Sequence, residues 1–375
     1  MNERKAYLIL ENGRVFEGKF FGAQGEVTGE IVFTTGMTGY LETLTDPSYC
    51  GQIVMQTFPL IGNYGVIPED FESAEVGAKA YIVKHPCRTP SNFRSKNDLG
   101  AFLKERGIIG LYGIDTRSLT KIIRKNGVMN GKISSFEPTD ADFEEIKKYT
   151  VVNPIAKVSC ANQVSSRSVE KFLPQKNSKE ANENLKEPKR IALMDFGAKR
   201  GIANALVKRG CEVHIFPHDT QAEEILKIKP NGIMLSNGPG DPADPANKMI
   251  LLTLEALIKS GVPIFGICMG HQLLALANGY KTRKLKFGHR GANQPVKDMQ
   301  TGRVYITSQN HGYEVFAENQ NRDSYSFINV NDGSCEGLDY GVSFSVQFHP
   351  EACGGPLDTG FLFDRFMERI RHAAE

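Results

Sequence analysis

A cysteine flanked by glycines stands between an apolar strand pattern and an apolar helix pattern, in the sequence Gly266-Ile-Cys268-Met-Gly270. Glycines two residues to either side of a nucleophile permit the sharp strand-to-helix turn called a nucleophile elbow. The N-terminus of the following helix favours a thiolate and presents backbone N–H groups to a developing oxyanion. We therefore expect Cys268 to act in acyl transfer. The other interpretation of this pentapeptide is a buried structural cysteine on a glycine-rich turn.

A nucleophilic cysteine needs a base, and His349 in the sequence His349-Pro-Glu351 is the favoured candidate over His271 and His311. Residues 344–348 have the pattern of a strand, so side chains 349 and 351 should project to the same side at its end. A carboxylate in that position would orient the imidazole and stabilise its charged form. The combination predicts a Cys-His-Glu triad.

A glycine-rich loop, Ser236-Asn-Gly238-Pro-Gly240-Asp-Pro242, directly follows a predicted strand at 232–235. It could simply be a tight loop with Asp241 as the cap of the next helix. Its glycines could instead offer backbone donors to a carbonyl oxygen. Ligands of open parallel sheets bind beyond the carboxyl ends of the strands, which makes the residues after strands 232–235 and 263–267 the first candidates.

The elements that would position these residues differ between the two halves of the chain. After residue 190 strands and helices alternate, which predicts an α/β domain with a mainly parallel central sheet flanked by helices. Before it, short strands and Asn-Gly turns predict a strand-rich mixed α/β domain. We expect domains at 1–150 and 190–375, joined by a connecting segment and linker at 151–189. The helices predicted with the clearest patterns are 98–106, 116–125, 248–259 and 361–372.

Composition excludes several functional classes. Lys and Arg number 45 and Asp and Glu 43, for a formal charge of +2, so neither a nucleic acid nor a membrane surface is an expected partner. The charged N-terminus has no signal-peptide pattern, and glycines interrupt the most apolar window, 262–280, so we expect a cytoplasmic protein without a membrane span. The 7 cysteines are scattered without a Cys-x-x-Cys pair, which predicts neither a disulfide framework nor a metal site. Glycine, 37 of 375 residues, is the one excess.

Together, Asn237-Gly-Pro-Gly-Asp-Pro242, Gly266-Ile-Cys-Met-Gly-His-Gln272 and His349-Pro-Glu351 resemble the motifs of class I, triad-type glutamine amidotransferases. The N-terminal half adds motifs that resemble the small subunit of carbamoyl phosphate synthetase. They are Thr35-Gly-Met-Thr-Gly-Tyr40, Leu44-Thr-Asp-Pro-Ser-Tyr49, Gly62-Asn-Tyr-Gly65 and Gly113-Ile-Asp-Thr-Arg117. The resemblance covers nearly the whole chain apart from the linker.

The resemblance implies a role for each matching position. Cys268 would attack the side-chain amide of L-glutamine and form a thioester, His349 would relay protons, and Glu351 would orient His349. Backbone N–H groups of Gly238 and Met269 would hold the oxyanion. The residues implied to bind glutamine are Ser48, Gly238, Gly240, Met269, Gln272, Asn310, Gly312 and Tyr313. Two positions have no catalytic role in this interpretation: His271 is taken as structural and Cys353, beside the triad, as an idle thiol.

The resemblance also implies a partner. The chain shows no Gly-x-x-x-x-Gly-Lys-Ser/Thr phosphate loop, so no cofactor is expected in it, and ATP and Mg are expected on a large synthetase subunit. That subunit would make carbamoyl phosphate from bicarbonate and ammonia for arginine and pyrimidine synthesis. One alternative is an amidotransferase subunit of another synthase, of the anthranilate or GMP type. Another is a catalytically idle subunit that only binds a partner.

Overall fold

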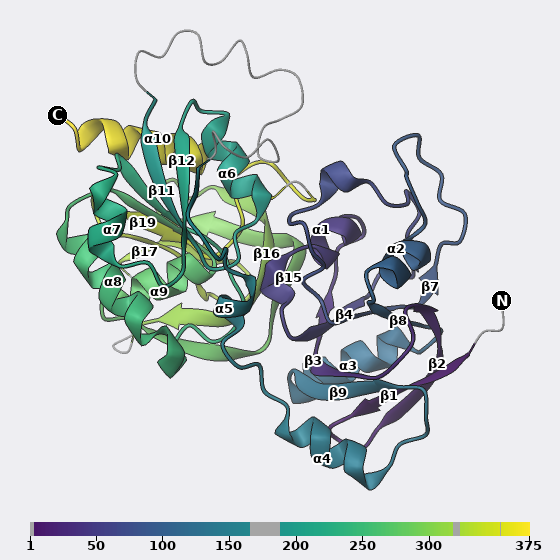
Figure 1. The fold of residues 1–375 in the computed structure, drawn as a ribbon. Coiled ribbons are helices and arrows are strands. Elements are labelled where there is room, and N and C mark those ends of the chain that lie inside the picture. Colours follow the sequence, from purple (N-terminus) through teal and green to yellow (C-terminus); the bar gives the residue numbers. More distant parts are fainter. Residues whose placement is uncertain (1–3, 166–187, 318–322, 353) are drawn as a thin grey trace. The chain divides into compact units, whose positions relative to one another are not determined.

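The computed structural model describes residues 4–165, 188–317, 323–352 and 354–375, and it divides into two compact units (Figure 1). Unit 1 comprises residues 1–152 and 286–291, and unit 2 comprises residues 153–285 and 292–375. The chain thus returns to unit 1 for a short segment within one long strand. Most of the predicted linker lies outside the described residues.

The strands of unit 1 close into a barrel in the order β1-β2-β8-β6-β4-β3-β9. They are β1 (Lys5–Leu10), β2 (Val15–Gly22), β3 (Val27–Thr34), β4 (Gln52–Gln56), β6 (Ala80–Val83), β8 (Ile109–Tyr112) and β9 (Met129–Ser134). β1 and β2 form the hairpin that the Asn12-Gly13 turn predicts, with Leu8 opposite Phe16. β3, β4, β6 and β8 run parallel. Antiparallel pairing of β9 with both β1 and β3 closes the ring.

Helices cover the barrel strands, so alternate side chains enter different hydrophobic clusters, as the period of two in a strand requires. Ile31 and Phe33 of β3 pack in the same cluster as α3 (Thr116–Asn126). Val32, between them, packs in the cluster that contains α1 (Tyr40–Leu44) and α2 (Leu99–Glu105). Phe287, from the second segment of unit 1, stacks on Phe33 with ring centroids 6.2 Å apart.

A buried lysine, Lys132 on β9, joins the barrel to α4 (Asp140–Lys148). Its ammonium lies 2.8 Å from carboxylate oxygens of Asp142 and Glu145 and 3.1 Å from one of Glu26. The hydrogen bond from Lys132 lowers the pKa of Asp142 to about 2. This cluster fixes α4 on the barrel by charge as well as by packing.

Unit 2 is built on a sheet with the strand order β10-β12-β11-β13-β14-β19-β18-β17-β15-β16. Its strands are β10 (Val164–Ser165), β11 (Arg190–Asp195), β12 (Glu212–Pro217), β13 (Gly232–Leu235), β14 (Ile264–Ile267), β15 (Lys281–Asp298), β16 (Val304–Phe316), β17 (Tyr325–Asn329), β18 (Cys335–Asp339) and β19 (Phe344–Val346). Neighbours from β12 to β19 run parallel, with Leu235 opposite Gly266 and Ile267 opposite Val346. Outside this central part, β10 pairs antiparallel with β12, and β17 pairs antiparallel with both β15 and β18, as β18 does with β19.

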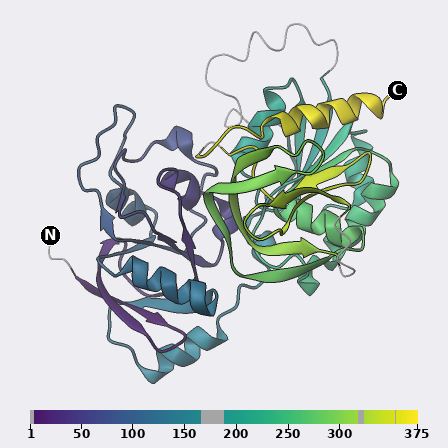
Figure 2. The same ribbon diagram turned by 180° about the vertical axis from the view of Figure 1, so that it is seen from behind.

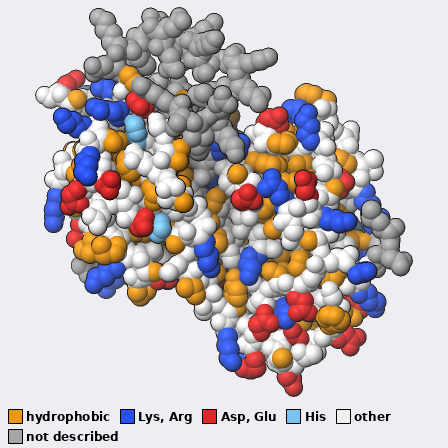
Figure 3. Space-filling model, viewed as in Figure 1, with side chains coloured by type: hydrophobic (Ala, Val, Ile, Leu, Met, Phe, Trp, Pro, Cys, Tyr) orange, Lys and Arg blue, Asp and Glu red, His pale blue; other side chains and the backbone are white. Residues whose placement is uncertain are grey.

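Helices lie on both faces of this sheet, which explains why its central strands are apolar on both sides. α6 (Arg200–Val207) and α10 (Phe361–His372) pack in one cluster, and Figure 2 shows α10 lying across the strands. α7 (Ala222–Lys227), α8 (Lys248–Lys259) and α9 (Met269–Ala277) pack in the other. The predicted fold class is therefore confirmed. Figure 3 shows acidic and basic side chains interspersed on the face in view, in keeping with the small net charge.

The short elements complete the described chain. They are β5 (Leu60–Ile61), β7 (His85–Pro86), α5 (Pro154–Val158) and the 3-10 turns Pro47–Tyr49, Pro68–Asp70 and Pro245–Asn247. Within the described residues, no helix has the length and apolar character needed to cross a membrane. The strand predicted at 344–348 is shorter than expected, because pairing with β14 ends at Val346.

Candidate active site

Cys268 occupies the turn between β14 and α9, as the motif predicts. Its backbone has φ 54° and ψ −105°, which places a residue with a side chain in a region that few such residues adopt. Backbone strain of this kind costs about 1–3 kcal/mol and persists only where the surrounding structure enforces it. The side chain is almost completely buried, and its sulfur lies 3.7 Å from the carbonyl oxygen of Asn310.

The two glycines of the motif make this turn possible by allowing close backbone packing. A Cβ at Gly270 would lie 2.4 Å from the carbonyl oxygen of Leu235 at the end of β13. A Cβ at Gly266 would lie 2.7 Å from the carbonyl oxygen of Gly270. Gly270 N also donates to the carbonyl oxygen of Ser236 at 2.9 Å. The start of α9 is therefore held against the carboxyl end of a neighbouring parallel strand, where the sequence placed the site.

His349 and Glu351 follow β19 and meet as an ion pair. His349 Nδ1 lies 2.7 Å from Glu351 Oε1, and both side chains are sealed from solvent. The backbone N–H of His349 donates to the carbonyl oxygen of Ser308 at 3.0 Å, which ties this segment to β16. The Nδ1–H donated to Glu351 fixes the ring so that Nε2 is the nitrogen left for chemistry.

The electrostatics of this pair depend on two further groups. Burial lowers the pKa of His349, and so does Lys199, but Glu351 and Cys268 outweigh them and raise it to about 10. Burial raises the pKa of Glu351, yet His349 and Lys199 bring it below its usual value. Lys199 Nζ lies 3.7 Å from Glu351 Oε1 and is itself buried. The structure thus favours a charged imidazolium beside a carboxylate.

His271 lies in α9, and its ring is fully buried. Its Nδ1 lies 2.8 Å from Ser345 Oγ of β19. Burial lowers the pKa of His271 to about 3, so this ring accepts a proton poorly. These contacts differ from those of His349, whose neighbours favour the charged form.

The loop after β13 is tightly packed. A Cβ at Gly238 would lie 2.3 Å from the carbonyl oxygen of Phe196, and Gly240 has φ +98° with Pro154 against it. Asp241 caps a turn by accepting from Ala243 N, while Asp244 caps the 3-10 turn that precedes α8. The alternative in which Asp241 caps the next helix is therefore wrong, because the caps are Asp244 for the 3-10 turn and Asn247 for α8.

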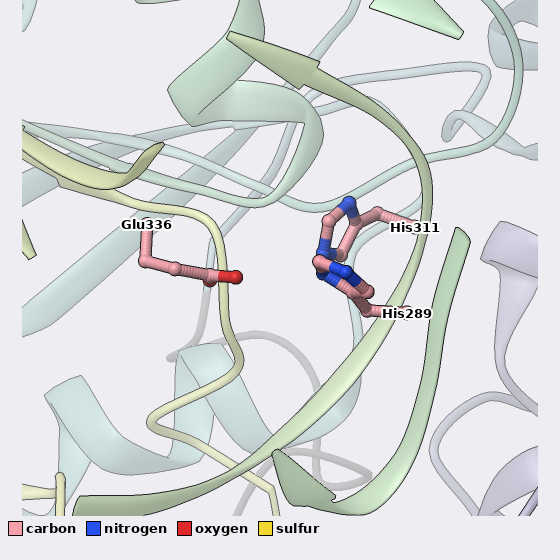
Figure 4. Close-up of side chains that lie close together, drawn as sticks. All are labelled: His289, His311 and Glu336. Atoms are coloured by element: carbon pink, nitrogen blue, oxygen red, sulfur yellow. The ribbon is translucent and has the colours of Figure 1, made fainter. Parts of the chain in front are cut away.

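Hydrogen bonds connect residues 310–313 of β16 to α9 and to β18. Gln272 Nε2 donates to the carbonyl oxygen of Tyr313 at 2.9 Å, and His311 Nδ1 lies 2.8 Å from the same oxygen. His311 Nε2 lies 3.0 Å from Gln309 Oε1, and Gln309 Nε2 donates to Glu336 at 2.9 Å. Figure 4 shows the Glu336 carboxylate, from β18, directed toward the His311 ring.

Both ring nitrogens of His311 and both carboxylate oxygens of Glu336 take part in these hydrogen bonds. Both nitrogens of His311 face oxygen acceptors, and the two Glu336 oxygens accept from Gln309 and Asn329. The third side chain labelled in Figure 4, His289, belongs to the 286–291 segment of unit 1. Within unit 2, His311 and Glu336 thus belong to one hydrogen-bonded network.

Unit 2 therefore brings together Cys268, His349 and Glu351, with Gln272 and Tyr313 joined beside them. Gly238 and Gly240 lie in the loop after β13, Met269 is the first residue of α9, and Asn310 and Gly312 lie on β16. Ser48 belongs to unit 1, in the turn Pro47–Tyr49, where its N–H donates to Asp46 Oδ1 at 2.9 Å. Its role in binding stays a prediction. Cys353 lies outside the described residues.

Two buried residues at this site were missed by sequence reasoning. Lys199 follows the end of β11, a position that the strand-end rule marks as a candidate. Gln347 directly follows β19 and lies two residues before His349, the candidate base, so its place beyond a strand end is the signal that could have marked it. Position in the sequence alone assigns no role to Lys199 or Gln347, because their roles depend on the contacts with Glu351 and Gln272 that form only in the fold.

Comparison with known proteins decides the family. The family model described as "Carbamoyl-phosphate synthase small chain, CPSase domain" matches residues 8–133, and "Glutamine amidotransferase class-I" matches residues 192–369. A carbamoyl phosphate synthase small chain of Fusobacterium nucleatum is 50% identical over 369 residues, covering 97% of each chain. The chain belongs to the carbamoyl phosphate synthase small chain family. This membership makes it the subunit type of a glutamine-hydrolysing enzyme.

Other relatives carry related names. The carbamoyl phosphate synthase small chain of Clostridium perfringens is 49% identical, covering 97% of this chain and 99% of the relative. The "pyrimidine-specific small chain" of Bacillus subtilis is 48% identical, covering 98% and 96%. Among solved structures, a glutamine amidotransferase from Thermotoga maritima is 16% identical, covers 50% of this chain and 85% of its own, and has a TM-score of 0.37.

Proposed function

We propose that this chain hydrolyses L-glutamine through a Cys268-His349-Glu351 triad and delivers ammonia to a large subunit. The observation that carries the proposal is the pairing of a nucleophile elbow with a buried His349–Glu351 pair whose bond is 2.7 Å long. The names of relatives about 50% identical over nearly the full length support it.

The chemistry follows from the positions of the side chains. Cys268 Sγ, having given its proton to His349, attacks the side-chain carbonyl carbon of glutamine. The C–N bond breaks as His349 returns the proton to the leaving nitrogen, so ammonia departs and a thioester remains. Water, deprotonated by His349, then attacks the thioester and releases glutamate and the Cys268 thiol.

The oxyanion of each tetrahedral intermediate needs preorganised donors. The N–H of Met269 stands at the first position of α9, where the helix dipole favours negative charge. The N–H of Gly238 would be the second donor. Ser48, Gly240, Asn310, Gly312 and Tyr313, with Gln272, would hold the rest of the substrate.

The ammonia would be used by another polypeptide. A large subunit carrying ATP and Mg would make carbamoyl phosphate from bicarbonate, for arginine and pyrimidine synthesis in the cytoplasm. The small chains named in the comparisons imply such a partner by their designation.

Cys268→Ser in the assembled enzyme tests both parts of the proposal. We expect glutamine-dependent synthesis of carbamoyl phosphate to be lost while ammonia-dependent synthesis is retained, because only the glutaminase step needs the thiol. Cys160→Ser, a matched change elsewhere in unit 2, should retain both activities. Loss of both activities in Cys268→Ser, or recovery of a different synthase with the tagged chain, would contradict the proposal.

A further inference from the structure

The segment from β19 to His349 contacts α9 through the side chains of Ser345 and Gln347. Ser345 Oγ lies 2.8 Å from His271 Nδ1, and Gln347 Oε1 accepts from Gln272 Nε2 at 2.9 Å. His349, two residues further along the chain, carries the ring of the candidate base. Gln347 is completely buried and Gln272 is 3% exposed, so the contact between their amides is shielded from competing water.

The orientation of both amides follows from one backbone carbonyl. The Tyr313 oxygen can only accept, so the Gln272 atom 2.9 Å from it must be Nε2. The same Nε2 faces Gln347, which must therefore present Oε1. Gln347 Nε2 is left sealed from solvent without a hydrogen-bond partner in the described part of the chain. Burial of this N–H group without a partner costs free energy, so the contact between Gln347 and Gln272 persists although it lowers the stability locally.

Both N–H groups of Gln272 are used in these bonds, and none of the described residues bonds its carbonyl oxygen, which is left for another partner. Gln272 lies one helical turn past the nucleophile, with its N–H bonded to the Cys268 carbonyl oxygen at 3.1 Å. An acceptor fixed one helical turn from Cys268 suits the ammonium group of an amino acid whose far end is being attacked.

We propose that Gln347 is a positioning residue that locks the Gln272 carboxamide so that its Oε1 accepts from the α-ammonium of glutamine. Being sealed from solvent, Gln347 acts only through Gln272. The pair selects a substrate that carries an ammonium over an otherwise identical amide that lacks one. This inference rests on the proposed glutaminase function.

The test compares two variants of the assembled enzyme on two substrates, L-glutamine and glutaramate, which is glutamine without the α-amino group. Gln347→Met keeps the volume and removes the acceptor, so KM for glutamine should rise about 3- to 10-fold with kcat within about twofold. KM for glutaramate should not change. Gln347→Glu keeps an acceptor oxygen and should hold KM for glutamine within about threefold of the parent.

A double-mutant cycle separates positioning from a general loss of structure. In a Gln272→Met background, Gln347→Met should have no further effect on KM, because the group it positions is gone. Gln300→Met, at an exposed turn of unit 2, is the matched control and should match the parent. If Gln347→Met does not fold, Gln347→Asn, whose shorter side chain cannot reach Gln272, carries the same expectations.

Three results would overturn the inference: an unchanged KM for glutamine in Gln347→Met, an equal rise for both substrates, or additive effects in the cycle. Failure of the underlying function has a different signature. In that case the parent enzyme itself would hydrolyse no glutamine, and a glutamine-analogue electrophile would not alkylate Cys268.

Discussion

Replacing Glu351 by glutamine tests how the carboxylate controls the base. Glu351 Oε1 lies 2.7 Å from His349 Nδ1 in a site closed to solvent. Burial and Lys199 lower the pKa of His349, whereas Glu351 and Cys268 raise it to about 10. Glutamine keeps the size and the acceptor oxygen of Glu351 but not its charge. Burial and Lys199 would still lower the pKa of His349, but the negative charge of Glu351 would no longer raise it, so this pKa should fall.

The size of the fall can be worked from the lost charge, because the glutamine oxygen can still accept from Nδ1. An opposite charge in direct contact shifts a pKa by about 1–3 units, and about 1.4 kcal/mol corresponds to one unit. We therefore expect the pKa of His349 to fall by about 1–2 units. Because the pKa of His349 is higher in the folded protein than the ordinary 6.5, protonation of this ring stabilises the fold. This stabilisation is complete below pH 6.5 and is lost as the pH rises through about 10. The variant should accordingly also be less stable at neutral pH.

The assay is the pH dependence of kcat/KM for glutamine, together with ¹⁵N NMR of the His349 ring. If imidazolium protonates the leaving ammonia, the alkaline limb should move down by about 1–2 pH units in Glu351→Gln. Lys199→Met removes an opposing charge and should not move the limb down. Glu212→Gln removes a carboxylate 3.3 Å from His214 in the same unit and is the matched control. An unmoved limb in Glu351→Gln, or the same shift in Glu212→Gln, would refute this reasoning.

Three further predictions concern stability. Burial lowers the pKa of His271 to about 3, so between pH 6.5 and about 3 only the unfolded protein binds a proton at this ring. The parent should therefore lose about 1.4 kcal/mol of unfolding free energy for each unit that the pH falls in this range. The His271→Gln variant lacks this contribution, and urea unfolding at several pH values checks the difference. Asp142→Asn should lower the free energy of unfolding at neutral pH by about 1–2 kcal/mol, because Lys132 loses a carboxylate. That difference should disappear as pH falls from 3.8 through about 2, where the parent carboxyl protonates, so chemical unfolding at neutral and acid pH checks it. Gly270→Ala should lower the free energy of unfolding by about 1–3 kcal/mol and slow alkylation of Cys268, because the new Cβ would lie 2.4 Å from a backbone oxygen of β13. Gly360→Ala is the control, because its new Cβ would lie 3.5 Å from the nearest atom, and it should leave the thermal-unfolding midpoint unchanged.

Local patterns predicted several elements of unit 2, because the apolar period and the end signals of a single helix or strand lie close together in the sequence. The helices at 248–259 and 361–372 and the strand at 232–235 have the expected bounds. The closed barrel of unit 1 was not predicted. Its closure pairs Leu8 with Ile133, two residues far apart in the chain, and no local pattern encodes that pairing.

The same limit applies to the candidate site. Motif spacing predicted that Cys268, His349 and Glu351 belong to one site, because all three follow the ends of strands. Lys199 and Gln347 gain their meaning only from packing, because the sequence shows neither the 3.7 Å approach of Lys199 to Glu351 nor the amide contact with Gln272. The roles of the site residues and the predicted domain boundaries stay predictions.

The return of residues 286–291 to unit 1 means that no single cut yields two complete fragments. A fragment ending near Val152 would lack Phe287, which stacks on Phe33, and Lys286, whose carbonyl oxygen accepts from Val128 N at 2.9 Å. The complementary fragment would keep Phe287 without the ring it stacks on. Gene dissection at the apparent domain junction would therefore remove part of one core, and covalent continuity through β15 links the folding of the barrel to the synthesis of a segment encoded far downstream.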